Sequence, residues 1–189
     1  MIKFRTVEEA KAVQIPELPR SYSEQFNALE KIVRTGNENS VSKLRKIYAL
    51  TDMLTAFVAP YMVCQKGCAH CCRIDVLVSS IEAQYIERNL GVVPRSSNSI
   101  SSGHSESKKS CPFLSEDSAC SIYEYRPFAC RTYHAVDDPA LCEDMDATHV
   151  TYTSKSNGTL NKLFYIIGFL NGNRPIRDIR DFFPNGRES

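Results

Sequence analysis

The sequence has no long apolar run, no excess of either charge and no glycine-rich nucleotide loop. Its hydrophobic stretches fall short of the ~18 residues that a membrane-spanning helix needs. Its 23 basic and 22 acidic residues nearly cancel, which leaves no electrostatic field that would attract nucleic acid. The first residues also lack the apolar core and the small-residue cleavage site of a secretory signal. We therefore expect a cytoplasmic protein that binds neither membrane nor nucleic acid.

The absence of a Gly-x-Gly-x-x-Gly loop removes the usual signal for a dinucleotide site. The sequence therefore leaves open whether the protein is an enzyme. Its length of 189 residues suits one domain. Within it we expect an N-terminal helical segment over residues 1–60, a cysteine-cluster metal-binding region over 61–150, and a C-terminal helical segment over 151–189 that packs on the same core.

Cysteine is the residue that the sequence has in abundance. Four of the eight cysteines fall within nine residues, as Cys64, Cys68, Cys71 and Cys72. The other four arrive one at a time, as Cys111, Cys120, Cys130 and Cys142. Such a set indicates disulfides, a metal or iron–sulfur site, or redox chemistry on the thiols. Because cytoplasmic thiols are kept reduced, the expected compartment favours metal binding or catalysis over disulfides.

The spacing of the cysteines limits the kind of metal site. Cys68 and Cys71 form a Cys-x2-Cys pair, which delivers two sulfurs to one ion from a single turn. The four later cysteines contain no such pair, so the pattern is not that of a zinc ribbon. Zinc and iron–sulfur clusters both use thiolate ligands, and eight thiols suffice for two four-thiolate sites or for one with accessory thiols. We expect the adjacent side chains of Cys71 and Cys72 to diverge toward different centres.

Other polar residues near the cysteines are secondary candidates. Four basic residues flank the motifs and would offset thiolate charge by donating to sulfur: Lys66, Arg73, Arg126 and Arg131. His70, between two cysteines, is a candidate imidazole ligand, and His134 and His149 are weaker ones. The acidic residues around Cys142 are expected to form a solvated loop; they are Asp137, Asp138, Glu143, Asp144 and Asp146.

Apolar periodicity and capping patterns predict a mainly α-helical chain. The expected helices cover residues 7–13, 21–36, 39–57, 79–91, 160–170 and 175–183, with one short strand over 74–78. Ser21 to Glu24 and Ser79 to Glu82 are capping-box patterns. The helix over 160–170 is apolar almost all round, so we expect it to be buried. The serine-rich residues 94–110, with His104 among them, are expected to form a flexible surface loop.

The second half of the cysteine framework has a recognisable form. Three motifs follow the leading Cys64 to Cys72 block in order: Cys111-Pro-Phe-Leu114, Cys120-Ser-Ile-Tyr123 and Arg126-Pro-Phe-Ala-Cys130-Arg131. Together they resemble the YkgJ-type cysteine-cluster family, the CxxCxxCC zinc- or iron-chelating domain. The resemblance implies that all eight cysteines are metal ligands and leaves the metal open. Relatives in that family include flagellin lysine methylases, in which a similar block serves an S-adenosylmethionine-dependent reaction.

We therefore predict a single, mainly α-helical domain whose helices flank an irregular, cysteine-rich metal-binding core. Its predicted function is to chelate zinc or an iron–sulfur centre through the eight cysteines. Two alternatives stay open: an iron–sulfur redox enzyme or electron carrier, and an accessory protein to a methylase-like reaction. The predicted partner is the metal ion, and the sequence does not indicate a protein partner.

Overall fold

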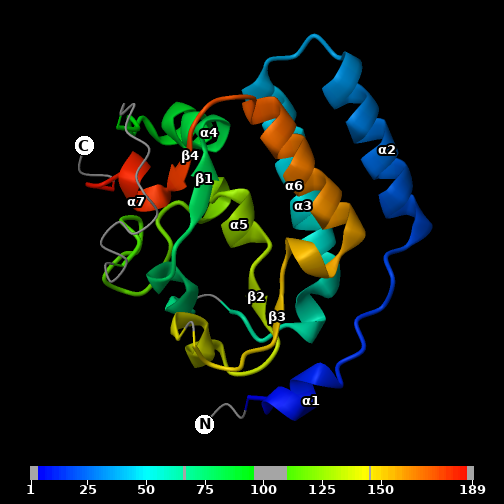
Figure 1. The fold of residues 1–189 in the computed structure, drawn as a ribbon, viewed down its shortest axis with the longest axis vertical. Helices are drawn as coiled ribbons and strands as arrows, with labels where there is room; N and C mark the ends of the chain where they lie inside the picture. Colours follow the sequence, from blue (N-terminus) through cyan, green and yellow to red (C-terminus); the bar gives the residue numbers. More distant parts are fainter. Residues whose placement is uncertain (1–3, 66, 96–109, 145, 187–189) are drawn as a thin grey trace.

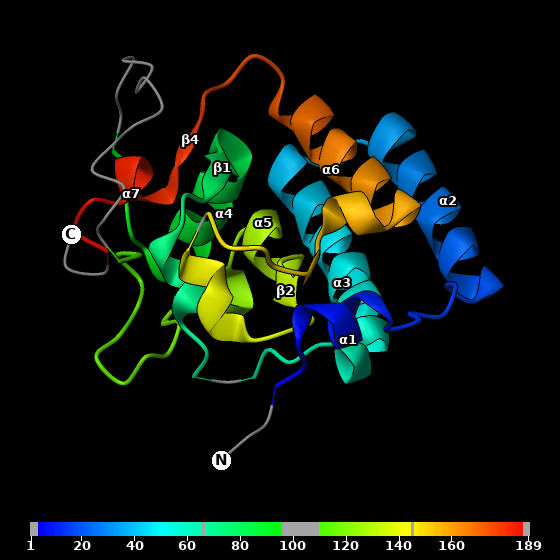
Figure 2. The same ribbon diagram turned by 60° about the horizontal axis from the view of Figure 1, so that its bottom comes forward.

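The computed structural model describes residues 4–65, 67–95, 110–144 and 146–186 of the chain. The described part consists mainly of helices joined by turns and a few short strands, which confirms the predicted mainly α class. The longest helices are α2 (Arg20–Thr35), α3 (Ser40–Val58) and α6 (Gly158–Asn171), and they lie side by side (Figure 1, Figure 2). The turns that carry the cysteines lie beyond α3 and α6 from α2 (Figure 1).

The central helix α3 begins and ends where its sequence indicates. Asn39 is the N-cap, and its side chain accepts a 3.0 Å hydrogen bond from the Ser42 amide, which satisfies one of the helix's free donors. The apolar stripe of α3 is buried, with Leu44 and Ile47 fully excluded from solvent. Pro60 lies in the 3-10 turn η1 (Ala59–Tyr61), which directly follows the helix and leads toward the first cysteine.

Helix α2 packs on α3 through the apolar residues that its periodicity predicts, which are Phe26, Leu29 and Val33. The start of α2 differs from the prediction, because the helix begins at Arg20 after Pro19 and has no side-chain cap. Ser21 and Glu24 already lie inside the helix, so their pattern is not a capping box. Pro19 is the N-cap, with φ −54° and ψ 147°, and the helix begins at the next residue.

The capping box of α4 (Ser80–Leu90) connects three helices. Both the amide and the hydroxyl of Ser79 donate to Glu82 Oε2, at 2.8 and 2.7 Å. The other carboxylate oxygen, Oε1, accepts from the Tyr48 hydroxyl at 3.0 Å and from the Phe128 amide at 2.8 Å. Phe128 begins α5 (Phe128–Arg131), so the buried Glu82 joins α4 to both α3 and the second cysteine region. Gly91 ends α4 at φ +73°, the left-handed conformation that favours glycine.

Two short antiparallel strand pairs connect distant parts of the chain. β1 (Leu77–Ser79) pairs with β4 (Ile176–Asp178), and β2 (His134–Ala135) pairs with β3 (Thr151–Tyr152). The predicted helix over 175–183 is therefore wrong in its first half, and only α7 (Ile179–Phe182) is helical there. Ile176, the first residue of β4, is exposed by 56%.

The prediction that α6 is buried all round is wrong. One face of α6 packs into the core through residues with at most 4% exposure: Leu160, Leu163 and Ile167. The other face is open, with Phe164, Tyr165 and Phe169 exposed by 54%, 68% and 70%. Helices α2 and α3 cover only one side of α6, so the second apolar stripe of the sequence stays at the surface.

A second apolar core lies beneath the cysteine-bearing turns. Its buried residues come from β1, α4, α7 and the turns between them, and the largest are Ile86, Phe113, Ile122, Phe182 and Phe183. Phe113 and Phe183 pack with their ring centroids 5.2 Å apart. Three cysteines, Cys111, Cys120 and Cys130, pack against this cluster. These three cysteines therefore rest on an apolar surface.

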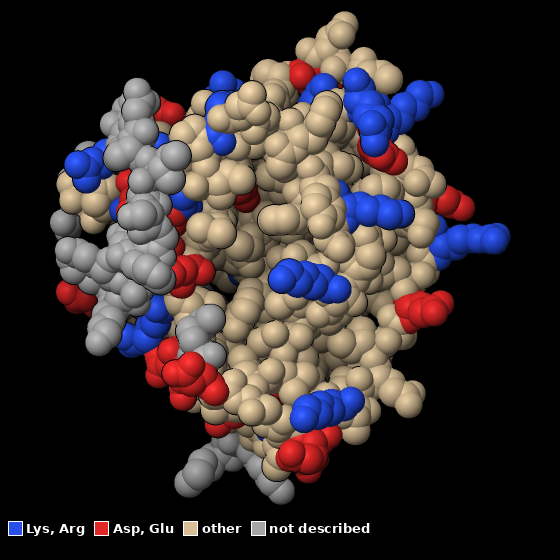
Figure 3. Space-filling model, in the orientation of Figure 1, with Lys and Arg blue, Asp and Glu red and all other residues tan. Residues whose placement is uncertain are grey.

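The remaining described elements are short. They are α1 (Val7–Lys11) and the 3-10 turns η2 (His70–Arg73), η3 (Tyr123–Tyr125), η4 (Pro139–Glu143) and η5 (Ser154–Ser156). Residues 96–109, most of the predicted flexible loop, and His104 within them lie outside the described residues. None of the helices in the described ranges is long and apolar enough to cross a membrane. Basic and acidic side chains are interspersed on the face that Figure 3 shows.

Candidate metal centre

The eight cysteines lie on loops and single helical turns rather than on the long helices. Cys64 and Cys68 follow η1, and Cys71 and Cys72 lie in η2. Of the later cysteines, Cys120 forms an isolated bridge with Leu114, Cys130 lies in α5 and Cys142 in η4. The turn η2 packs against η4, so the first and last parts of the cysteine framework meet in space. All eight cysteines are free thiols.

Three thiols, those of Cys64, Cys68 and Cys142, form what we call the first thiol group. The Cys64 thiol donates a hydrogen bond to Cys68, and both lie close enough to Cys142 for their charges to affect each other's pKa. The Ala135 amide donates to Cys64 Sγ at 3.1 Å, and the Tyr133 hydroxyl donates to Cys142. Such donors to sulfur orient thiolate ligands and stabilise their charge.

Four thiols form the second thiol group, which consists of Cys72, Cys111, Cys120 and Cys130. The charges of Cys111, Cys120 and Cys72 all raise the pKa of Cys130, so these three thiols lie within electrostatic range of it. The Cys111 amide donates to the Cys72 carbonyl oxygen at 2.8 Å and fixes the two chain segments together. The amide of Phe113 in turn donates to the Cys111 sulfur.

Cys71 lies between the two groups. Its thiol accepts a hydrogen bond from the Cys72 thiol, so the expectation that these adjacent side chains diverge is wrong. The single 3-10 turn η2 holds the two side chains on neighbouring faces, and Cys71 also lies near Tyr133. In the ranges that the structure describes, no three cysteine, histidine or acidic side chains are close enough to hold one metal ion. Side-chain rotation is therefore required to close a site.

Burial and mutual repulsion favour the protonated form of several thiols. Burial raises the pKa of Cys142 to about 11 and that of Cys111 to about 12, and neighbouring cysteines add to both shifts. The pKa of Cys130 is raised well above its ordinary value, first by burial and then by three neighbouring sulfurs. A cation among these sulfurs would reverse this repulsion, because metal binding favours the thiolate form.

Hydrogen bonds between thiols raise the pKa of the donors Cys64 and Cys72 and lower that of the acceptor Cys68. The pKa of Cys64 is raised because its thiol donates to Cys68, and that of Cys72 is raised because its thiol donates to Cys71. Cys68, which accepts, has its pKa lowered to about 6. This donor set of soft sulfurs fits zinc or an iron–sulfur cluster and does not fit magnesium or calcium, which prefer oxygen ligands.

Two guanidinium groups favour thiolate charge in the second thiol group. Arg126 lowers the pKa of Cys130, and Arg180 lowers that of Cys72 and Cys111. Arg180 also donates to the Cys72 carbonyl oxygen at 3.1 Å. The sequence gives no local signal for Arg180, because the pairing of β1 with β4 brings it to the cysteines from far along the chain.

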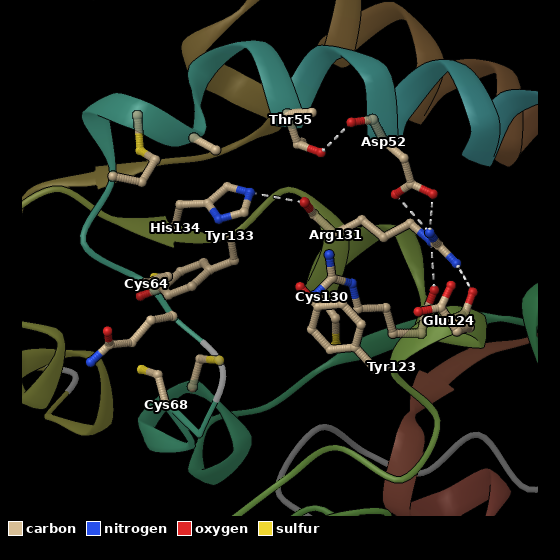
Figure 4. Close-up of a pocket in the computed structure, with 16 residues that line it drawn as sticks. Asp52, Thr55, Cys64, Cys68, Tyr123, Glu124, Cys130, Arg131, Tyr133 and His134 are labelled. Atoms are coloured by element: carbon tan, nitrogen blue, oxygen red, sulfur yellow. Dashed lines mark hydrogen bonds and ion pairs between the residues drawn. The ribbon is translucent and has the colours of Figure 1, made fainter.

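The other predicted basic residues have different partners. Arg131 donates to both carboxylate oxygens of Asp52, at 2.7 and 2.6 Å, and to two backbone carbonyl oxygens (Figure 4). The prediction that it donates to sulfur is therefore wrong. Arg73 Nε lies 2.8 Å from a carboxylate oxygen of Glu143. Lys66 lies outside the described residues.

The histidines near the cysteines differ in what their rings contact. His70 Nδ1 lies 3.5 Å from a Glu143 carboxylate oxygen, although the His70 amide donates to Cys68. His134 Nε2 lies 3.0 Å from the Arg131 carbonyl oxygen, and burial lowers its pKa. His149 Nε2, by contrast, lies 3.1 Å from Cys142 Sγ. The Cys-x6-His spacing is the only sequence signal for this contact, and it is a weak one.

One of the acidic residues near Cys142 is not part of a solvated loop, contrary to prediction. Asp137 is fully buried, and its Oδ1 lies 2.5 Å from His149 Nδ1. Its other carboxylate oxygen accepts the Val150 amide at 2.7 Å. The remaining acidic residues with described side chains near Cys142, Asp138, Glu143, Asp144 and Asp146, are exposed or partly exposed. Asp137 thus differs from its neighbours by supporting a buried imidazole.

A cavity of about 540 Å³ opens beside both thiol groups. Cys64 and Cys68 lie on one side of it, and Cys130 lies on the other side with Arg131 (Figure 4). Its lining also includes Arg126, Tyr133 and His134. The cavity therefore brings solvent or a small molecule next to the residues that carry these thiols.

The fold and the site together define a mainly helical protein whose eight thiols gather on irregular turns between two apolar cores. The chain belongs to the family described as "CxxCxxCC: Putative zinc- or iron-chelating domain", whose profile matches residues 63–157, half of the chain. The match begins one residue before Cys64 and spans all eight cysteines. Neither the curated proteins nor the solved structures contain a match to the chain.

Proposed function

We propose that this protein binds zinc or an iron–sulfur centre in the cytoplasm through its framework of eight cysteines. The first thiol group supplies one centre and the second thiol group supplies another. Cys71 lies between the groups and contributes through its contact with Cys72. The family to which the chain belongs is described as zinc- or iron-chelating, which supports a metal as the natural partner.

The observation that carries this proposal is the mutual influence of the thiols. Seven of the eight cysteines fall into two groups by their effects on one another's pKa, Cys68 also raises the pKa of Cys72 across the groups, and none of the eight forms a disulfide. Five of these pKa values are raised. Sulfur atoms gathered in this way bind a soft cation strongly as thiolates.

Metal analysis of protein purified without oxygen tests the proposal. We expect at least one zinc or iron per chain, and an absorption spectrum separates the two because iron–sulfur clusters absorb visible light. Cys64→Ser with Cys68→Ser should remove the metal of the first thiol group, and Cys111→Ser with Cys130→Ser that of the second. Each double variant should then retain the metal of the other group. Stoichiometric disulfides with no metal under these conditions would contradict the proposal.

A second candidate function is that of an iron–sulfur redox enzyme or electron carrier. The cavity beside Cys64, Cys68 and Cys130 favours it, because a purely structural thiolate site is normally closed by its own ligands. Its side chains include the guanidinium of Arg126, whose Nε is buried without a hydrogen-bond partner among the described residues. A reversible bleaching of the visible spectrum by dithionite, shifted by small anions, would support it. A colourless zinc protein would exclude it.

A further inference from the structure

His149 is buried next to the first thiol group although it lies on a loop between η4 and β3. Its side chain is 8% exposed, and its Nε2 lies 3.1 Å from Cys142 Sγ. The backbone next to it is fixed, because the Val136 amide donates to the Val150 carbonyl oxygen at 2.9 Å. The imidazole is therefore held against the sulfur by the backbone on which it lies.

The second ring nitrogen of His149 faces a buried carboxylate. Nδ1 lies 2.5 Å from Asp137 Oδ1, and the Asp137 side chain is 1% exposed. In the described part of the chain neither of these two buried atoms makes a hydrogen bond of regular geometry, so the pair is a close contact between the carboxylate and the ring. The Val150 amide holds the carboxylate in place by donating to its other oxygen. A carboxylate at one ring nitrogen keeps the proton there and directs the lone pair of the other nitrogen outward.

This arrangement is the one that carboxylate-supported histidine ligands use in metal sites. The lone pair of Nε2 points toward Cys142, beside the two other sulfurs of the first thiol group. Around a tetrahedral zinc, a sulfur ligand at 2.3 Å and a nitrogen ligand at 2.0–2.1 Å lie roughly 3.5 Å apart. The observed separation of 3.1 Å between Nε2 and Sγ is close to this value. His149 and Cys142 are therefore spaced for one shared ion, and side-chain rotation of the other two cysteines is required to complete the site.

We infer that His149 is the fourth ligand of the first thiol group, so that the site consists of Cys64, Cys68, Cys142 and His149, with Asp137 as the positioning residue. This inference rests on the proposed function. It explains why the group contains only three thiols, since Cys71 contacts Cys72 instead. It also predicts two chemically different centres, one with three sulfurs and one nitrogen and the other with sulfur ligands alone.

A catalytic thiol is the competing interpretation, because cysteine, histidine and aspartate in this order also form nucleophilic triads. The burial of the sulfur disfavours it. Cys142 is 3% exposed and is absent from the lining of the cavity beside the other cysteines. Its sulfur already accepts the Tyr133 hydroxyl and lies near Cys68. A nucleophile needs access for its substrate, which this position does not provide.

Cobalt(II) titration of the metal-free 189-residue chain tests the inference, since the absorption bands of bound Co²⁺ report its sulfur and nitrogen ligands. We expect wild-type protein to bind one Co²⁺ with three sulfurs and a nitrogen, in addition to sulfur-only binding. His149→Gln should abolish the mixed signal. Asp137→Asn should weaken it by ~10–100-fold, as loss of such supporting residues does. His149→Cys should restore the stoichiometry with a sulfur-only spectrum, which a merely structural histidine would not do.

His134→Gln is the matched control, because the ring of His134 contacts a backbone carbonyl oxygen rather than sulfur. This variant should keep both signals. Unchanged stoichiometry and spectrum in His149→Gln would overturn the inference while leaving the proposed function intact. Wild-type protein that binds no Co²⁺ at all would overturn the proposed function itself. Rapid alkylation of Cys142 by iodoacetamide in the metal-loaded protein would favour a catalytic role for this thiol and would reject Cys142 and His149 as metal ligands.

Discussion

Arg131 directs its guanidinium away from the adjacent Cys130 and donates through Nη1 to both carboxylate oxygens of Asp52, at 2.7 and 2.6 Å. The same group donates to the Arg126 and Glu124 carbonyl oxygens and lies over the Tyr48 ring, 4.2 Å from its centroid. Arg131 is only 4% exposed, whereas Asp52 is 48% exposed on α3. The contact anchors the turn that carries Cys130 to the central helix.

Asp52→Asn should lower the free energy of unfolding by ~1–2 kcal/mol, because it leaves a buried guanidinium without its anion while two carbonyl acceptors remain. The half exposure of Asp52 keeps this value below that of a fully buried pair. Urea denaturation of the metal-loaded protein measures it. The control is Glu30→Gln, which breaks the exposed Arg34–Glu30 pair and should change stability by less than ~0.5 kcal/mol. If Asp52→Asn and Glu30→Gln lowered the free energy of unfolding equally, the Arg131–Asp52 contact would contribute no more to stability than an exposed ion pair.

Glu82 also anchors helix α5, which carries Cys130, to the long helices, in this case through the Phe128 amide at the start of α5. Its two carboxylate oxygens accept four hydrogen bonds, from the amide and hydroxyl of Ser79, the Tyr48 hydroxyl and the Phe128 amide. Glu82→Gln places an NH₂ group against at least one of these donors, so we expect a loss of ~2–3 kcal/mol. The exposed Glu24→Gln on α2 serves as control and should be neutral within ~0.5 kcal/mol. A neutral Glu82→Gln would mean that water, not Glu82, satisfies these donors.

The parts of the fold that the sequence predicts are those that depend on local interactions. Helix α3 follows from the Asn39 cap and its apolar stripe, and α4 follows from the reciprocal contacts of Ser79 and Glu82 and from the left-handed Gly91. Each signal lies within a few residues of the helix end that it determines. The strand β4 depends instead on β1, a partner far along the chain, and a three-residue strand carries too little pattern to be recognised alone.

In the candidate site, too, the features that the sequence predicts are local and the features that it misses depend on long-range packing. The cysteines and their motifs are visible in the sequence, but the two sets into which they fall depend on how η2, η4 and α5 pack. Asp137 is one of five acidic residues near Cys142, and only its burial against His149 sets it apart. Arg180 reaches Cys72 through the pairing of β1 with β4. These contacts join residues that are distant in sequence, so no local pattern indicates them.

Proton release should accompany metal binding. The pKa values of Cys64, Cys72, Cys111, Cys130 and Cys142 are raised, with Cys111 at about 12 and Cys142 at about 11, so these thiols are protonated at pH 7. A metal must displace their protons, and the apparent affinity therefore rises as the pH rises, by ~10-fold per pH unit for each proton displaced. Cys68, with its pKa lowered to about 6, releases little above pH 7.

Calorimetric titration of the metal-free protein with Zn²⁺ measures this release, when it is repeated at pH 7 in buffers of different ionisation enthalpy. We expect several protons per chain. Cys68→Ser should leave the proton count nearly unchanged at pH 7 while weakening binding, whereas Cys142→Ser should reduce the count by about one, in line with their opposite pKa shifts. Binding that releases no protons, or that tightens as the pH falls, would show that the thiols are not the ligands.

Removal of the metal should unfold the second cysteine region locally and leave the long helices folded. Between Cys111 and Cys142 the chain has single turns and short loops, closed by hydrogen bonds such as that from the Ser121 amide to the Phe113 carbonyl oxygen at 2.8 Å. Thiolate sites contribute on the order of 10–16 kcal/mol in small peptides, as much as the whole stability of a domain. Helices α3 and α6 bury their own apolar stripes in a separate core.

Hydrogen exchange on chelated protein measures the effect at individual amides. We expect the amides of Cys111, Leu114 and Ser121 to exchange at least ~100-fold faster without metal, while the amides within α3 and α6 change by less than ~10-fold. Restoring Zn²⁺ should restore protection, which separates metal loss from damage to the thiols. Protection of the 111–142 amides that persists without metal would show that the apolar cluster under Phe113 and Ile122 holds this region by itself. The metal would then bind to a fold that forms without it, and this result would favour a redox or catalytic centre over a structural one.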